Sequence, residues 1–423
     1  MGWPANIPLE PTPGGPLTRP AGFPRSVISL LARRGSAETL AGLRGDENRR
    51  VGISRNVFGG RMEYSRREFS GLVSLGLAGL VTQVRAQGTD TFAPFVPGDV
   101  THRRVQANGL NFHIAEQGTG PLVLLCHGFP ESWYSWRHQI PVIAKAGFHA
   151  VAPDMRGYGQ SDAPPEVSAY NMLDLVGDVV ALVAALREKQ AILVGHDFGA
   201  NLAWNAVMMR PDLFTAIAAM SVPFLPRGSA PPLRLVRAQG LYTYYQIYYQ
   251  DVGVADAEYD RDPRATLRRT FYSLSGDAPK GRPPVRILQP GKGALDNTID
   301  PEHLPAWLTE ADLDYMEADI RRTGFRPGLN WYRNIDRNWE LTAPWAGAGI
   351  RQRALFIAGT EDHVIYGPTG TGKPQLQGMV DAVPNLERLL LIEGAGHYIQ
   401  QERPQQVNQA LIQFLRGGAA APR

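Results

Sequence analysis

The chain has 423 residues, 43% hydrophobic and 9% aromatic, so it can bury one large core or two modest ones. Its charge of +3 is uneven: residues 1–86 carry 12 Arg and 6 acidic residues, whereas the remainder carries 31 basic and 34 acidic residues, which gives no electrostatic case for a nucleic-acid partner. The single cysteine, Cys126, excludes an internal disulfide, and the absence of an HExxH motif or Cys/His cluster leads us to predict no metal site and no cofactor.

Residues 1–61 are rich in Pro, Gly and Arg and have little periodicity, which predicts disorder or an extension upstream of the true start. In residues 62–86, the pair Arg66-Arg67 precedes an apolar run from residue 71 to 84 and a small-residue cleavage pattern ending at Ala86. This order resembles a twin-arginine export signal, and the alternative is an amphipathic helix with a chance Arg pair. We therefore predict a periplasmic or extracellular protein, or a cytoplasmic one if the signal is not used.

The apolar run of this segment is shorter than the roughly 20 residues that a bilayer span requires, so we predict no stable membrane span. Export signals start near the N-terminus, whereas this one starts late in the chain. Initiation at Met62 would remove the conflict, which N-terminal sequencing can test.

From about residue 100 the pattern changes to alternating strands and helices. An Asn-Gly pair between short alternating runs over 105–116 predicts a β-hairpin. Apolar runs predict strands at 121–126, 146–152, 191–194, 216–221, 354–358 and 388–392, and a helix at 172–187. We predict an α/β fold with a mostly parallel central sheet, flanked by helices and built from residues 100–223 and 341–416.

Residues 224–340 lack strand alternation and contain aromatic-rich helical segments, which predicts an inserted helical lid. Within it, residues 277–304 are rich in Pro, Gly and Lys and are predicted to form a loop.

The predicted strand at 191–194 runs into Gly195-His-Asp-Phe-Gly-Ala200, a small-x-nucleophile-x-small pattern with Asp197 at its centre. Small residues permit a sharp turn that projects the central side chain at the sheet edge and frees the N–H of Phe198 to stabilise an oxyanion. A carboxylate is ionised at neutral pH and can attack an sp3 carbon to form an alkyl ester. The alternative is an Asp that caps the following helix.

Two further groups follow predicted strands downstream. Asp362 ends the string Leu355-Phe-Ile-Ala-Gly-Thr-Glu-Asp, and His397 ends Leu391-Ile-Glu-Gly-Ala-Gly-His. The order Asp197, Asp362, His397 is the nucleophile, acid, base order of the α/β-hydrolase fold, in which His397 would activate water and Asp362 would fix its tautomer. Glu361 is a rival for the acid on the residues alone.

Upstream, Cys126-His-Gly-Phe-Pro130 follows the first long apolar strand, where this fold supplies a second oxyanion donor from a loop. The N–H of Phe129 is our candidate donor. The Phe129-Pro130 bond is a candidate cis bond.

The strings His127-Gly-Phe-Pro-Glu-Ser-Trp-Tyr-Ser-Trp-Arg137, Asp154-Met-Arg-Gly-Tyr-Gly-Gln-Ser161 and Gly195-His-Asp-Phe-Gly199 together resemble epoxide hydrolases of the α/β-hydrolase fold, over roughly residues 100–416. The resemblance implies an enzyme that converts an epoxide and water into a vicinal diol through an Asp ester, with no cofactor, and it favours Asp362 over Glu361. It also implies that Trp133 contacts the substrate.

Two lid segments, Tyr242-Thr-Tyr-Tyr-Gln-Ile-Tyr-Tyr-Gln250 and Gly328-Leu-Asn-Trp-Tyr-Arg-Asn334, resemble those that carry the paired ring-opening tyrosines of soluble epoxide hydrolases. On that resemblance we assign Tyr245 and Tyr332 as acids and substrate-binding residues. A phenol suits the role because its pKa of about 10 keeps it protonated at neutral pH while it donates to a developing alkoxide. Helical spacing alone gives Tyr245 no preference over its neighbouring tyrosines.

Haloalkane and haloacid dehalogenases share the Asp nucleophile and are the alternative function. Phe198 argues against them, because haloalkane dehalogenases use a Trp N–H at this position to hold the halide and fluoroacetate dehalogenases commonly place Arg there. A non-catalytic ligand-binding relative ranks last, since every catalytic member is present. The sequence makes no prediction for oligomeric state, substrate size or stereochemistry.

Overall fold

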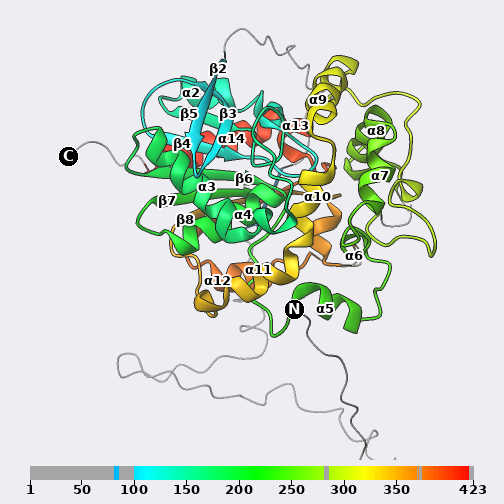
Figure 1. The fold of residues 1–423 in the computed structure, drawn as a ribbon. Coiled ribbons are helices and arrows are strands. Elements are labelled where there is room, and N and C mark those ends of the chain that lie inside the picture. The colour runs from blue at the N-terminus through cyan, green and yellow to red at the C-terminus, as the bar shows by residue number, and fades with distance from the viewer. Residues whose placement is uncertain (1–80, 85–99, 281–284, 369, 371–373, 419–423) are drawn as a thin grey trace, which may run out of the picture. The chain divides into compact units, whose positions relative to one another are not determined.

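The computed structural model describes residues 81–84, 100–280, 285–368, 370 and 374–418. They form a sheet with the strand order β1-β9-β8-β7-β6-β4-β5-β3-β2 (Figure 1). The strands are β1 (Val81–Val84), β2 (Thr101–Ala107), β3 (Leu110–Gln117), β4 (Leu122–Cys126), β5 (His149–Pro153), β6 (Ala191–His196), β7 (Phe214–Met220), β8 (Arg353–Gly359) and β9 (Leu386–Ile392). Only β3 is antiparallel to its neighbours β2 and β5, so the sheet is mostly parallel, as predicted.

The predicted hairpin is the pair β2 and β3. Its two turn residues, Asn108 and Gly109, have φ angles of 46° and 75°. Two consecutive left-handed residues are what a tight two-residue hairpin turn requires, and Asn and Gly adopt that conformation most readily.

Helices cover both faces of the sheet, with α3 and α4 in front of it and α14 behind it in Figure 1. These core helices are α2 (Ile140–Lys145), α3 (Met172–Ala185), α4 (Phe198–Met209), α12 (Gln377–Ala382), α13 (Ile399–Glu402) and α14 (Pro404–Gly418), with the short 3-10 helices η2 (Trp133–Trp136), η3 (Val167–Tyr170) and η6 (His363–Tyr366). Every residue of β4 is buried, which explains why the central strands are continuous apolar runs rather than alternating ones.

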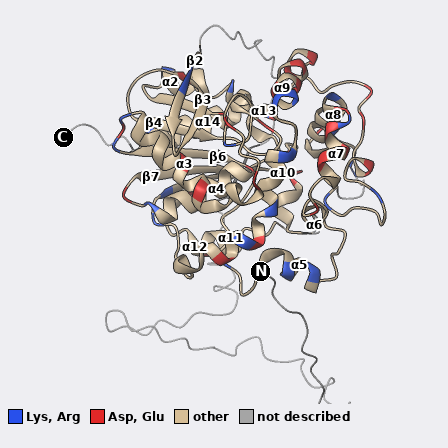
Figure 2. Cartoon of the chain, viewed as in Figure 1, with Lys and Arg blue, Asp and Glu red and all other residues tan. Residues whose placement is uncertain are grey.

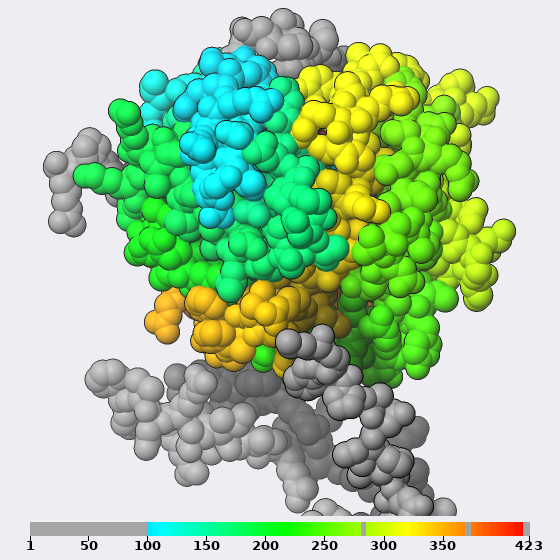
Figure 3. All heavy atoms as spheres, in the orientation of Figure 1, coloured from blue at the N-terminus to red at the C-terminus, as the bar shows by residue number. Residues whose placement is uncertain are grey.

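Between β7 and β8 the chain adds no strand to the central sheet in its described part, and we call residues 224–340 the lid. Its helices are α5 (Pro232–Ala238), α6 (Tyr245–Tyr248), α7 (Val254–Asp260), α8 (Pro263–Leu274), η4 (Leu295–Asn297), α9 (Glu310–Thr323), α10 (Arg326–Arg333) and α11 (Ile335–Leu341), followed by η5 (Ala343–Trp345). Figure 3 shows the yellow and yellow-green lid residues packed against the cyan and green core. The indole N–H of Trp331 in α10 donates to the carbonyl of Arg156 in the core, at 3.2 Å.

Ion pairs join the outer lid helices, on which Figure 2 shows charges of both signs. Arg264 of α8 lies 2.5 Å from Glu310 and 2.6 Å from Asp314, both on α9. These contacts fix α8 and α9 as a pair.

The predicted export signal lies mostly outside the described residues. Its described part, Val81–Val84, pairs in parallel with β9 as the edge strand β1, which the sequence analysis did not predict. Among the described residues, no helix has both the length and the apolar character needed to cross a membrane.

Candidate active site

Asp197 stands at the sharp turn between β6 and α4, at the C-terminal edge of the sheet. Its φ and ψ are 52° and −121°, a conformation that L-residues rarely adopt. The turn is tight because Gly195 and Gly199 are in contact: a Cβ on Gly195 would lie 2.4 Å from the Gly199 carbonyl oxygen. Asp197 precedes α4, yet its side chain makes no capping hydrogen bond. The helix-capping interpretation is therefore not supported, and the Asp197 carboxylate is available to react with a substrate.

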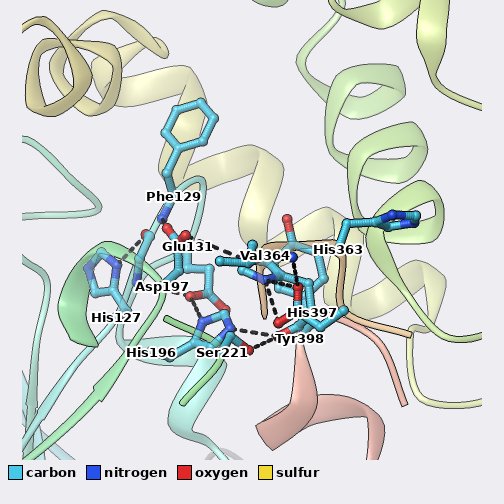
Figure 4. Close-up of polar contacts among 12 residues, drawn as sticks. His127, Phe129, Glu131, His196, Asp197, Ser221, His363, Val364, His397 and Tyr398 are labelled. Carbon is cyan, nitrogen blue, oxygen red and sulfur yellow. Dashed lines mark hydrogen bonds and ion pairs between the residues drawn. The ribbon is translucent and has the colours of Figure 1, made fainter. Parts of the chain in front are cut away.

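The loop after β4 approaches this carboxylate closely. The backbone N–H of Phe129 donates to Oδ1 of Asp197 at 3.0 Å, and the Phe129-Pro130 bond is cis (Figure 4). A Cβ on Gly128 would lie 2.4 Å from the Asp197 Cβ, so only glycine permits this approach.

His397 lies between the two carboxylates. Its Nε2 is 3.4 Å from Oδ2 of Asp197, and its Nδ1 is 3.2 Å from both carboxylate oxygens of Asp362. Asp362 in turn accepts from the N–H of Val364 at 2.9 Å, which fixes the carboxylate. The rival Glu361 is partly exposed and pairs with Lys280 instead. Of the two adjacent acids, therefore, Asp362 is the one beside the imidazole.

Behind His397 lies a buried set of polar groups that was not predicted from the sequence. The hydroxyl of Ser221 and Nε2 of His196 both contact the His397 carbonyl oxygen, at 2.7 and 2.8 Å (Figure 4). Glu131 lies 2.7 Å from Nδ1 of His196 and accepts from the N–H of Gly128 at 3.0 Å. Glu131 lies in the string from His127 to Arg137, and His196 lies in the string from Gly195 to Gly199. Their presence inside motifs that form the site is the sequence signal that could have identified them.

The pKa values of the three groups are linked. Burial would lower the pKa of His397, but the carboxylates of Asp362 and Asp197 raise it well above its usual value. Burial would raise the pKa of Asp197, yet hydrogen bonding and charge from His397 and the Phe129 N–H lower it to about 2. The geometry therefore favours an ionised nucleophile beside a protonated imidazole.

A cavity opens over this site between core and lid. Asp197, His397, Tyr245 and Tyr332 all line it, and the rings of the two tyrosines are 5.9 Å apart, centroid to centroid. Burial, followed by the charge of Asp197, raises the pKa of Tyr332 well above 10, so this phenol is protonated at neutral pH. The structure thus brings together both lid tyrosines and the core residues that the sequence analysis selected.

Two other predicted residues take different places. Phe198 begins α4, and its ring packs on Tyr332 with centroids 4.6 Å apart. Trp133, expected to contact the substrate, does not line this cavity: its indole N–H donates to the hydroxyl of Tyr315 in α9 at 2.8 Å. Its place in η2, which Ser132 caps, directs the indole toward α9. Trp133 is thus a contact between core and lid, and its contact with the substrate stays a prediction.

Comparisons with known proteins agree with this geometry. The family described as alpha/beta hydrolase fold matches residues 121–404. "Epoxide hydrolase A" of Mycobacterium tuberculosis is 44% identical over 330 residues, which are 76% of this chain and 98% of that protein. "Epoxide hydrolase 2" of Siraitia grosvenorii is 41% identical over 320 residues, which are 75% and 98% of the two chains. The crystal structure of epoxide hydrolase A from Mycobacterium thermoresistibile matches with a TM-score of 0.70 and 45% identity, over 75% of this chain and 98% of that one.

Proposed function

Because the chain belongs to the epoxide hydrolases of the α/β-hydrolase fold, we propose that Asp197, His397, Asp362, Tyr245 and Tyr332 carry out its hydrolysis of epoxides to vicinal diols. One observation carries the proposal: Asp197, Tyr245 and Tyr332 line one cavity, with His397 beside Asp197. A carboxylate and paired phenols are the nucleophile and acids that epoxide opening needs.

In the first step, a carboxylate oxygen of Asp197 attacks one epoxide carbon and the C–O bond to the ring oxygen breaks. The electron pair of that bond goes to the ring oxygen, which takes a proton from Tyr245 or Tyr332. The product is a hydroxyalkyl ester of Asp197. The N–H of Phe129 remains hydrogen-bonded to the carboxylate and orients it for attack.

In the second step, water attacks the ester carbonyl carbon of Asp197 while His397 takes a proton from it. Alkylation removes the negative charge of Asp197, one of the two charges that raise the pKa of His397. The imidazole proton can then return to the tyrosinate left by the first step, and the neutral imidazole acts as the base. The N–H groups of Phe129 and Phe198 hold the oxyanion until it collapses. The ester C–O bond then breaks, the departing diol oxygen takes the proton from His397, and the regenerated Asp197 carboxyl returns a proton to His397, which restores the starting ion pair.

Dehalogenation uses the same nucleophile but needs donors for a departing halide. Phe198 offers a hydrocarbon ring at the position after the nucleophile, and that ring packs on Tyr332. Neither the site nor the relatives favour a dehalogenase.

To test the proposed roles, the purified protein is incubated with a set of aryl and alkyl epoxides, and separately with haloalkanes and haloacids. Diol formation and halide release are then measured. We expect diol from epoxides and no halide release. Full diol formation by Asp197→Ala would overturn the assignment of the nucleophile.

We also propose that residues 62–86 direct export and that residues 224–340 act as a lid over the site. Cleavage after Ala86 would remove β1, whereas retention would keep Val81–Val84 in the sheet. N-terminal sequencing of the protein from the exported and cytoplasmic fractions distinguishes these outcomes: a mature N-terminus at residue 87 supports export, and an intact residue 62–86 segment in the cytoplasm contradicts it.

A further inference from the structure

Arg286 is a buried cation at the wall of the cavity, in a stretch that the sequence analysis predicted only as a loop. Its side chain is 9% exposed, and it lines the cavity with Asp197 and both lid tyrosines. Backbone hydrogen bonds fix it beside α6: the N–H of Tyr245 donates to the Arg286 carbonyl at 2.9 Å, and the N–H of Leu288 donates to the Thr243 carbonyl at 2.8 Å. The position of Arg286 next to Tyr245 is thus set by the fold.

The guanidinium of Arg286 bonds to neutral groups. Nη1 donates to the carbonyl oxygens of His363 and Gly367, at 3.2 and 2.8 Å, and Nη2 donates to the hydroxyl of Tyr244. Within the described ranges, no acidic side chain forms an ion pair with it, and its Nε is buried without a hydrogen bond. Burying a charge without an ion pair lowers the stability of the fold. A role in packing alone therefore explains Arg286 poorly, and a role in the reaction explains it better.

The contacts of Arg286 continue to Tyr245. Arginine can only donate, so the Tyr244 oxygen accepts from it and the Tyr244 proton is directed elsewhere. The rings of Tyr244 and Tyr245 are in contact, with centroids 4.8 Å apart, and the Cζ of Arg286 lies 5.2 Å from the first centroid and 5.5 Å from the second. The Tyr245 oxygen accepts from the side-chain amide of Gln246 at 3.0 Å. Because its oxygen accepts in this bond, the phenol of Tyr245 has its proton left to donate.

We propose that Arg286, whose guanidinium lies beside the rings of Tyr244 and Tyr245, is a positioning residue that holds Tyr245 for donation to the epoxide oxygen and stabilises the negative charge that develops there. The inference rests on the proposed role of Tyr245 as an acid. A cation this close to a phenol stabilises the negative charge that grows on the phenol oxygen as its proton leaves, which strengthens the acid.

The electrostatic surroundings of Tyr245 agree with this role. Burial raises the pKa of Tyr245, the charge of Arg286 lowers it, and the charge of Asp197 raises it. Removal of Arg286 therefore raises this pKa further and makes Tyr245 a weaker acid. The titratable groups that face Tyr245 are Tyr244, Tyr249, Tyr259, Arg286, Tyr332 and Asp197.

The test measures ester formation and ester hydrolysis separately in single turnovers of the full chain. We expect Arg286→Met to slow ester formation about tenfold, because it weakens Tyr245 as an acid, and to leave ester hydrolysis within about twofold. The alkaline limb of ester formation should move to higher pH. Arg227→Met is the matched control, because Arg227 also contacts an aromatic ring, that of Trp339, and a backbone carbonyl, but does not line the cavity.

A double-mutant cycle separates positioning from simple structural support. In the Tyr245→Phe background, Arg286→Met should cost less than about twofold, since there is no phenol left to position. Equal losses in both backgrounds, equal slowing of both steps or an unmoved alkaline limb would overturn the inference. If Arg286→Met does not fold, Tyr244→Phe removes the hydroxyl that holds the Arg286 guanidinium and should likewise slow only ester formation. Failure of the native protein to convert any epoxide would instead refute the proposed roles themselves.

Discussion

The core and the lid contribute to the site in different ways. Asp197, Asp362 and His397 each follow a buried strand of the core, at the C-terminal edge of the sheet, and backbone groups fix their positions. Tyr245 and Tyr332 come from short lid helices, α6 and α10, and meet through aromatic contacts. The comparison predicts that changes in the core affect both chemical steps or the second one, whereas changes in the lid affect the first.

The largest effect is expected for His397→Gln. Ester formation should continue, because Asp197 and both tyrosines remain, whereas ester hydrolysis should fall by about 10⁴-fold or more, as for loss of a member of a catalytic triad. Intact-mass spectrometry should then show the protein with one substrate added. If the variant turns over at the native rate, or if it never gains mass, the assignment of His397 to ester hydrolysis alone would be wrong.

Asp362→Asn should lower the rate of ester hydrolysis by about 10²- to 10⁴-fold. The Asp362 carboxylate is the leading cause that raises the pKa of His397 against the effect of burial. Its loss lowers that pKa, so the pH at which ester hydrolysis reaches half its maximum should move down. The neighbouring Glu361→Gln is the control, and a larger effect from it would mean that the two acids have been assigned the wrong way round.

Single substitutions of the lid tyrosines should slow ester formation by about 10²-fold each, and the double substitution should abolish measurable alkylation. No adduct should accumulate, in contrast to His397→Gln. Tyr242→Phe is the control, because Tyr242 belongs to the same aromatic run but is 69% exposed. Accumulation of the ester in Tyr245→Phe or Tyr332→Phe would place these phenols in the second step instead.

The smallest effect concerns the contact of α9 with the core. Burial, followed by the charge of Asp154, raises the pKa of Asp319 in α9 to about 7. A carboxyl whose folded pKa is raised destabilises the protein as pH rises from its unfolded pKa through the folded one, here from about 4 to 7. Asp319→Asn should therefore add about 1–2 kcal/mol of stability at pH 8 and little at pH 4. Thermal unfolding at the two pH values measures this, and an equal gain at both would exclude titration as the cause.

The sequence predicted the core better than the lid for a physical reason. Strands buried on both faces produce apolar runs, and a side chain just beyond such a run must lie at the sheet edge, so Asp197, His397 and the adjacent acids Glu361 and Asp362 could be found from spacing alone. The choice of Asp362 over Glu361 needed the family resemblance. The structure supplies its physical basis, since only Asp362 faces the imidazole.

In the lid, no periodicity distinguishes a residue that faces the cavity from one that packs the helix. Tyr245 and Tyr332 were therefore selected by resemblance. Trp133 was also predicted as a site residue, and its indole bonds to Tyr315 of the lid. Arg286 had no sequence signal at all, because its position depends on backbone pairing with the Tyr244 segment across the lid.

The most direct test of the central claim is a single turnover in oxygen-18 water with excess native protein over a simple aryl epoxide, followed by analysis of the diol and of the peptide that contains Asp197. Attack by Asp197 predicts that the first diol carries unlabelled oxygen from the carboxylate and that label appears in the Asp197 peptide, with neither diol nor label in Asp197→Ala. Label in the first diol, with none in the peptide, would show direct attack by water and contradict the ester mechanism.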